Sequence, residues 1–190
     1  FISDDGYNWT IVPQDNYNYN NLLAPQHVCW SPLLGMWVIV RQGSSVFVSR
    51  DGWTWTEHSC PSGDWESVCW HSTGPSSGFF CAVSWTYDTY NSVMTSEDGV
   101  NWTLRTLTFK RQWFDVASNG SILCAVACPT TGLTTWTLMT SSDGINWTLR
   151  QAPINHRLRA ICWSQDLEIF CVASYDYDTA PDTHDVILSS

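Results

Sequence analysis

The feature that most constrains this chain is a short phrase that it repeats. "TSEDGVNWTLR" at residues 95–105 returns as "TSSDGINWTLR" at 140–150, and weaker copies lie at 2–12 and 48–58. The tryptophans of successive copies are 46, 47 and 45 residues apart, and they are Trp9, Trp55, Trp102 and Trp147. A constant period of this length indicates a repeat architecture and matches the four-stranded blade of a β-propeller.

The rest of the period also repeats. "HVCWSPLLGMWVIV" at 27–40 corresponds to 67–84 and 160–174, and a copy at 115–127 lacks the Cys-Trp pair. Each period predicts a strand around V-C-W, an apolar strand, a variable loop, a strand ending in Ser, and a strand beginning with Trp-Thr. Asp-Gly between the last two is a strong hairpin signal. The apolar strand lacks alternation, which favours burial on both faces.

We therefore predict an all-β fold, a β-propeller with four blade repeats of about 47 residues and four-stranded antiparallel blades. The chain is expected to be one domain over 1–190. Its blade-like units are 13–58, 59–105, 106–150 and 151–190, with 1–12 in addition. Residues 187–190 resemble a further third strand, so a four-bladed ring and a part of a larger propeller both remain open.

Composition narrows the class of partner. The 190 residues include eight Lys plus Arg against eighteen Asp plus Glu, for a formal net charge of −10. Phosphate binding needs clustered cations, so nucleic acid is not an expected partner. No apolar run reaches the length of a membrane span, and we expect none.

The four copies of Ser-x-Asp-Gly-x-x-Trp resemble the Asp-box, or BNR, repeats of sialidases and other propellers. They are one residue shorter between Asp and Gly, and this form, with residues 29–40 before it, resembles repeats of phage and other viral structural proteins. The resemblance implies a structural joint, in which Asp and Ser bond the amides of the turn and Trp packs between blades. The residues so assigned are Ser3, Asp5, Gly6, Trp9, Ser49, Asp51, Gly52, Trp55, Ser96, Asp98, Gly99, Trp102, Ser141, Asp143, Gly144 and Trp147.

A sialidase-type site would need an arginine cluster, a Tyr-Glu pair and an acidic Asp. Arg111, Arg157 and Arg159 precede two of the V-C-W-type strands, but they do not recur in register. Four repeats also fall short of the six blades of sialidases. We therefore expect no enzyme and no catalytic residue, with a degenerate sialidase-like glycosidase as the remote alternative.

Most cysteines fall at repeated strand positions, where other copies have Ala117 or Val38. A position shared by Cys, Ala and Val favours a small buried hydrophobe, so we expect free thiols, although the even number of cysteines allows disulfides. The repeated N-W-T sequons at Asn8, Asn101 and Asn146 leave glycosylation open. The histidines show no ligand spacing, and no metal site is expected.

Variable loops on a rigid scaffold are where binding residues concentrate. The loops after the apolar strands, at 84–92, 128–137 and 174–185, are rich in aromatics and Asp. The candidate binding face comprises Trp85, Tyr87, Asp88, Tyr90, Trp136, Tyr175, Asp176, Tyr177 and Asp178. Aromatic and carboxylate groups suit sugars and protein partners alike. Asp176, Asp178, Asp182 and Asp185 are candidate Ca²⁺ ligands without EF-hand spacing, so we expect no cofactor.

The sequence thus favours a non-enzymatic structural or attachment module of a larger assembly. A virion is the most favoured assembly, with contacts to other protein chains or to a host surface through one loop face. We expect a virion or extracellular location. The alternative is a carbohydrate-binding, lectin-like propeller. Dissimilar loops argue against sugar sites repeated in every blade.

Overall fold

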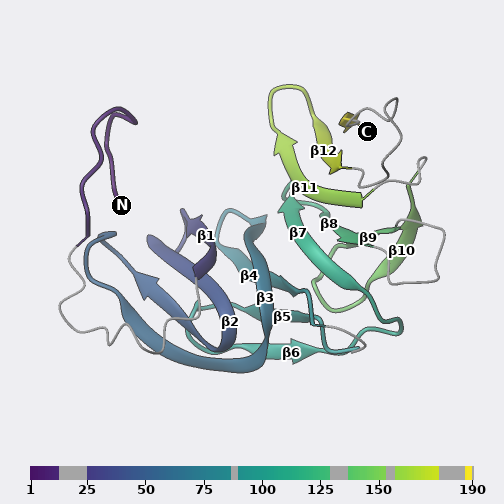
Figure 1. Cartoon of the computed structure of the whole chain (residues 1–190), viewed down its shortest axis with the longest axis horizontal. Coiled ribbons are helices and arrows are strands. Elements are labelled where there is room, and N and C mark those ends of the chain that lie inside the picture. Colours follow the sequence, from purple (N-terminus) through teal and green to yellow (C-terminus); the bar gives the residue numbers. More distant parts are fainter. Residues whose placement is uncertain (13–24, 87–89, 129–136, 153–156, 176–186, 190) are drawn as a thin grey trace.

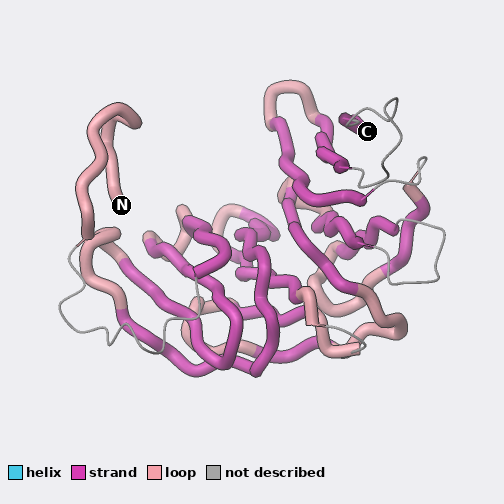
Figure 2. Tube along the Cα trace, in the orientation of Figure 1, coloured by secondary structure: helices cyan, strands magenta, loops and turns pink. Residues whose placement is uncertain are grey.

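The computed structural model describes residues 1–12, 25–86, 90–128, 137–152, 157–175 and 187–189. Within these ranges the chain forms strands and no helix (Figure 2). Accordingly, no helix in the described part of the chain is long and apolar enough to cross a membrane. The strands are β1 (Pro25–Ser31), β2 (Met36–Ser49), β3 (Thr56–Gly74), β4 (Ser77–Ser84), β5 (Val93–Ser96), β6 (Thr103–Arg105), β7 (Gln112–Ser118), β8 (Leu123–Cys128), β9 (Thr137–Ser141), β10 (Thr148–Gln151), β11 (Arg157–Ser164), β12 (Ile169–Tyr175) and β13 (Ile187–Ser189).

These strands form three antiparallel sheets. One contains β1 to β6 in sequence order, the second has the order β10-β9-β8-β7, and the third has the order β11-β12-β13. Each neighbouring pair is antiparallel. The all-β, antiparallel prediction is confirmed, whereas the count of four blades stays a prediction.

The strands define the units used below. The first unit is residues 25–61, the second 65–105, the third 112–151 and the fourth 157–189. The second and third units each contain four strands in the predicted order, with β3 and β7 as their first strands. The first unit differs, because β2 pairs with β1 through Met36–Arg41 and with β3 through Gln42–Val48. β3 then continues into the second unit, so that no break separates the first two units.

The units follow one another along an open arc (Figure 1). The N-terminal hairpin, residues 1–12, is closed by a bridge between Ile2 and Thr10. It stands at the end of the arc opposite to β13. In the described chain, β13 occupies the edge of β12.

The core lies between successive units. One buried cluster joins β2 of the first unit to Phe80 and Ala82 of β4, and the next joins Cys81 and Val83 of the same strand to the third unit. Neighbouring residues of β4 therefore face opposite clusters, and all four side chains are fully buried. This explains why the strand is apolar without alternation.

The Asp-Gly turns at Gly99 and Gly144 pack closely against the preceding unit. Gly52, Gly99 and Gly144 all have positive φ, which a side chain disfavours. A Cβ on Gly144 would lie 2.6 Å from Phe79 of the second unit, and one on Gly99 would lie 3.2 Å from Met36 of the first. Glycine is thus required both by the turn and by the close approach of the preceding unit.

Candidate binding site at the inner strands

The polar groups of each repeated turn form hydrogen bonds within that turn. Asp51 Oδ1 accepts hydrogen bonds from the backbone amides of Trp53 at 2.8 Å and Thr54 at 2.7 Å. Ser49 Oγ donates to the same oxygen at 3.0 Å and accepts from the Gly52 amide at 2.8 Å. Trp55 Nε1 donates to the Gly52 carbonyl at 2.9 Å.

The same bonds recur in the other copies. They link Ser3, Asp5, Gly6 and Trp9; Ser96, Asp98, Gly99 and Trp102; and Ser141, Asp143, Gly144 and Trp147. The amides of Thr54 and Trp53 lower the pKa of Asp51 to about 2. A carboxylate that is ionised and committed to backbone donors serves the turn, since a catalytic acid needs a pKa near the working pH.

The tryptophans of these turns differ in burial. Trp102 is half-buried in the core between the first two units, with its ring centroid 6.3 Å from that of Phe80. Trp147 lies likewise against the next cluster. Trp9, in the N-terminal hairpin, is 63% exposed. The same hydrogen-bonded turn therefore occurs with and without a packed neighbour.

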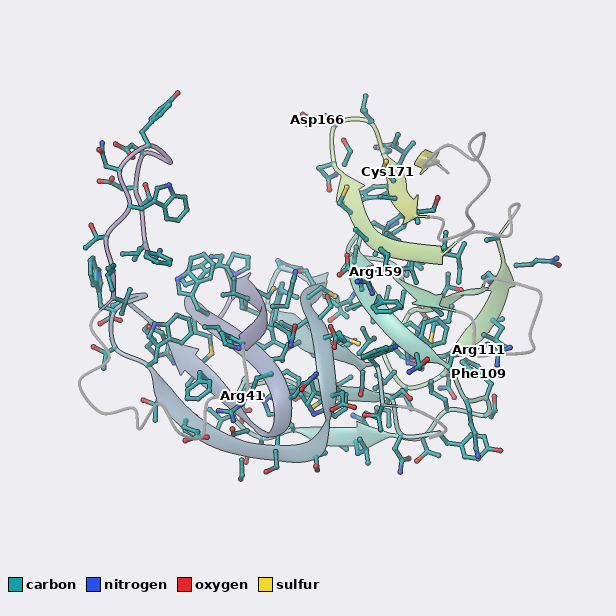
Figure 3. All side chains as sticks on the ribbon, viewed as in Figure 1. Arg41, Phe109, Arg111, Arg159, Asp166 and Cys171 are labelled. Carbon is teal, nitrogen blue, oxygen red and sulfur yellow. The ribbon has the colours of Figure 1, made fainter. Side chains whose placement is uncertain are left out.

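The structure keeps apart the two sialidase-type arginines whose side chains it describes, Arg111 and Arg159. Arg111 Nη1 donates to the carbonyl of Lys110, its own neighbour, at 2.8 Å. The guanidinium of Arg159 lies over the Phe114 ring, and Figure 3 shows the two arginines well apart. The side chain of Arg157 lies outside the described part of the structure.

Two residues of the predicted binding face are described. Trp85 is 40% exposed and Tyr90 is 46% exposed, and Lys110 Nζ lies 4.9 Å from the centroid of the Tyr90 ring. The remaining predicted residues lie outside the described side chains: Tyr87, Asp88, Trp136, Tyr175, Asp176, Tyr177 and Asp178, together with the Ca²⁺ candidates Asp182 and Asp185.

A feature that the sequence did not predict is a β-bulge at one equivalent position of every unit. In β3 the pairing register skips from Trp65 to Ser67, and in β7 it skips from Trp113 to Asp115. β1 and β11 show the same shift, between Pro25 and His27 and between Leu158 and Ala160. The bulged residues are Gln26, Glu66, Phe114 and Arg159. A bulge re-aims the side chain of its extra residue, and bulges are frequent beside functional sites.

In the first three units, the residue after the bulge bonds the next unit. His27 Nδ1 lies 3.1 Å from the carbonyl oxygen of Val68. Ser67 Oγ donates to Asp115 Oδ1 at 2.6 Å, and Asp115 Oδ2 accepts from the amide of Ile161 at 2.8 Å. These bonds run from β1 through β3 and β7 to β11. They hold β1, β3, β7 and β11, which we call the inner strands, in register with one another. The four bulges are therefore aligned as well.

Two of the bulged side chains, Phe114 and Arg159, are in contact, and Glu66 directly precedes Ser67, which bonds the strand of Phe114. The guanidinium carbon of Arg159 lies 4.1 Å from the centroid of the Phe114 ring. Trp85 lies on the same phenyl ring, with centroids 5.8 Å apart and planes 30° from parallel. Burial raises the pKa of Glu66, the positive charge of Arg159 opposes this rise, and Asp64 adds to it. We call Trp85, Phe114, Arg159 and Glu66 the bulge cluster.

The bulge cluster is held from behind by buried or bonded groups. Trp65, Trp113 and Leu158, the residues before the three bulges, are fully buried. Gln112 Nε2 donates to the carbonyl of Trp85 at 3.2 Å, and the Trp85 amide donates to the carbonyl of Asp64 at 2.9 Å. Support of this kind fixes side chains within a narrow range of positions, as a binding site requires.

The remaining candidate features in the described residues are a groove, the side chains that could bind a metal, and the cysteines. A groove of about 430 Å³ lies between His58–Pro61 and Val100–Thr103, and its lining residues contain no carboxylate. Within the described ranges, no three His, Cys, Asp or Glu side chains gather as a metal site would require. Seven cysteines are described, and all are free thiols. Burial raises the pKa of Cys29 to about 11, so this thiol stays protonated at neutral pH.

Comparisons with known proteins support the class of fold and do not extend to a function. No family model matches the chain, and no curated protein matches it. A chain from a nidogen/laminin complex matches with a TM-score of 0.60 and 11% identity over 79% of this chain. GH43B of the xyloglucan PUL from Bacteroides ovatus matches with a TM-score of 0.50 and 12% identity over 87% of it.

Both of these neighbours are β-propellers, so the likeness supports a propeller-type arrangement of the antiparallel sheets. The chain spans 56% and 38% of the lengths of the two matched structures. At such identities the likeness concerns fold alone, because one fold hosts many activities.

Proposed function

We propose that this chain is a non-enzymatic attachment module of a larger assembly, with a virion as the most favoured case. Its contacts are made through the surface that carries the bulge cluster. The observation that supports this most directly is the exposed Trp85 ring, stacked on Phe114 beside the Arg159 guanidinium. Exposed aromatic and arginine side chains on a rigid support are typical of binding surfaces.

The virion component of this proposal rests on the sequence pattern. The shortened Ser-x-Asp-Gly-x-x-Trp repeat resembles repeats of phage and other viral structural proteins. The non-enzymatic component rests on the chemistry of the described carboxylates. The four turn aspartates are committed to backbone amides. Glycoside hydrolysis needs two carboxyl groups placed across a substrate, and carboxylates that serve the turns are not free for that role.

A photo-crosslinker tests the contact surface. We would replace Trp85 by p-benzoylphenylalanine and irradiate the protein within its native assembly or on its host surface. A discrete crosslinked product is expected from position 85. Trp53, which is 45% exposed in the second repeated turn, provides the matched control position. Equal crosslinking from both positions, or none from position 85, contradicts the proposed contact surface.

Carbohydrate binding is the second candidate. It is favoured by the same Trp85 ring, because an exposed indole face suits the apolar face of a sugar. The guanidinium of Arg159, on the Phe114 ring that Trp85 also contacts, suits sugar hydroxyl groups. A glycosidase assay with aryl glycosides separates binding from catalysis, and no turnover is expected.

A further inference from the structure

We propose that the bulge cluster binds one neutral glycan per chain, and that this glycan is what the module attaches to. The inference rests on the proposed attachment function and adds the class of ligand and its number. It is carried by three observations: the bulges occur at the same register position, they present different side chains, and two of these, Phe114 and Arg159, are in contact next to the strand that carries Glu66.

The bulges recur at one position of the four inner strands. A bulge leaves a residue unpaired and disrupts the ladder, so its recurrence in all four inner strands calls for a common cause. One function of the bulge is to direct a side chain that regular pairing would send into the core or between the sheets. The flanking residues Trp65, Trp113 and Leu158 remain fully buried, so the core is continued on both sides of the extra residue. Each unit thus presents one side chain at low cost to its own packing.

The bulged side chains differ in chemistry from unit to unit. The residues before the bulges are large and apolar in three units, as packing requires. The bulged residues are an amide, a carboxylate, a phenyl ring and a guanidinium: Gln26, Glu66, Phe114 and Arg159. Because the four groups differ, the bulges cannot form four equivalent ligand sites, so a ligand at the bulge cluster is expected to bind once per chain.

The charges of the bulge cluster favour an uncharged ligand. Arg159 is exposed and Glu66 is half-buried, and the positive charge of Arg159 opposes the rise that burial causes in the pKa of Glu66. An anionic ligand that approached Arg159 would meet Glu66 and a chain of net charge −10. A cationic ligand that approached Glu66 would meet Arg159. An uncharged polyhydroxyl ligand avoids both conflicts, because its hydroxyl groups donate to the carboxylate and accept from the guanidinium.

Trp85 provides the exposed aromatic surface of the bulge cluster. Trp85 is 40% exposed although its ring already stacks on Phe114. The phenyl ring is in turn covered by the Arg159 guanidinium. This order leaves the indole as the exposed aromatic surface for a ligand, while Arg159 lies against the shared Phe114 ring. A sugar ring has the matching pattern of an apolar CH face and a polar edge.

The test begins with the purified chain on a printed array of neutral and sialylated glycans, followed by calorimetric titration of the strongest neutral glycan. We expect saturable binding with one site per chain. Trp85→Ala and Arg159→Gln should each weaken binding by about tenfold. Glu66→Gln should weaken it a few-fold, because an amide keeps one acceptor oxygen.

Two variants provide matched controls. Trp53→Ala removes an indole of similar exposure in a repeated turn, and Arg150→Gln removes an exposed arginine of β10. Both should bind as the unaltered chain does. All variants should show the unfolding midpoint of the unaltered chain to within a few degrees, which excludes misfolding as the cause of weaker binding.

Three outcomes overturn the glycan inference. They are the absence of binding to any neutral glycan, a stoichiometry of several glycans per chain, and tighter binding of sialylated glycans that increases in Glu66→Gln. If the array is negative while position 85 still crosslinks to a discrete protein, the partner is a protein. In that case the glycan inference fails and the proposed attachment function stands. If position 85 gives no product on any surface, the attachment function fails as well.

Discussion

Asp115 and Ile161 join the third unit to the fourth, because Asp115 Oδ2 accepts a hydrogen bond of 2.8 Å from the Ile161 amide. The other oxygen of the same carboxylate accepts from Ser67 Oγ of the second unit at 2.6 Å. One side chain therefore bonds the inner strands of two neighbouring units. Hydrogen bonds to a charged acceptor are among the stronger ones in proteins.

Removing this carboxylate should loosen the inner strands. We expect Asp115→Ala to lower the free energy of unfolding by about 2–4 kcal/mol, since the amide of Ile161 loses its acceptor. Urea-induced unfolding measures the change. Asp166→Ala, in the exposed turn between β11 and β12, is the control and should change stability by less than about 0.5 kcal/mol. An equal effect of the two substitutions would show that the hydrogen bonds of Asp115 do not stabilise the contacts between the units.

Burial of the turn tryptophans can be separated from their hydrogen bonds. Trp102 Nε1 donates to the Gly99 carbonyl at 3.0 Å, and Trp9 Nε1 donates to the Gly6 carbonyl at 3.1 Å. Only Trp102 of the two packs against a neighbouring unit. We expect Trp102→Ala to cost about 3 kcal/mol and Trp9→Ala less than about 1 kcal/mol. An unchanged melting temperature for Trp102→Ala would contradict its role in the core.

The turn glycines offer a second matched pair. Gly144 and Gly6 have φ values of 68° and 75°, so a side chain at either position adds backbone strain of about 1 kcal/mol. A Cβ at Gly144 would also lie 2.6 Å from Phe79, whereas nothing lies within 4 Å of one at Gly6. Gly144→Ala should therefore destabilise by about 2–4 kcal/mol and Gly6→Ala by about 1 kcal/mol. Similar losses in both variants would mean that the close approach to Phe79 has no energetic consequence.

Much of the fold was predictable because the repeat copies local signals. Asp-Gly fixed the position of the hairpins, and the unbroken apolar run of Phe80–Val83 indicated a strand buried on both faces. The continuity of β3 was not predictable, because Cys60–Gly63 contains Pro and Gly and has the composition of a connection. In the structure Gly63 pairs with Gly43, so tertiary pairing keeps this segment extended.

The candidate site was predictable only in part. Trp85 was identified from its place in a variable loop. The bulged residues were not, because a bulge depends on a shift in pairing and Gln26, Glu66, Phe114 and Arg159 share no residue type. The hydrogen bonds between the units were not predictable for the same reason, because His27, Ser67 and Asp115 perform one role with three different side chains.

The pH dependence of stability should reveal His71, which is almost fully buried between the second and third units. Its Nδ1 lies 2.8 Å from Ser118 Oγ, and its ring lies against Phe79. Burial lowers the pKa of His71, and a hydrogen bond with the backbone of Ser142 partly opposes this. The unfolded chain, with an ordinary histidine pKa of about 6.5, therefore binds a proton that the folded chain resists.

The stability from neutral His71 is accordingly complete above pH 6.5 and decreases as the pH falls below that value, by at most about 1.4 kcal/mol per pH unit. The turn carboxylates act in a separate window. Asp51 has a pKa of about 2 in the folded chain against 3.8 ordinarily, so its contribution is lost only below about pH 4. We expect urea midpoints measured from pH 7.5 to 4.5 to fall on acidification. His71→Gln should remove this fall between pH 6.5 and 4.5, and His58→Gln should leave it in place. A slope that survives in His71→Gln would assign the proton uptake to another group.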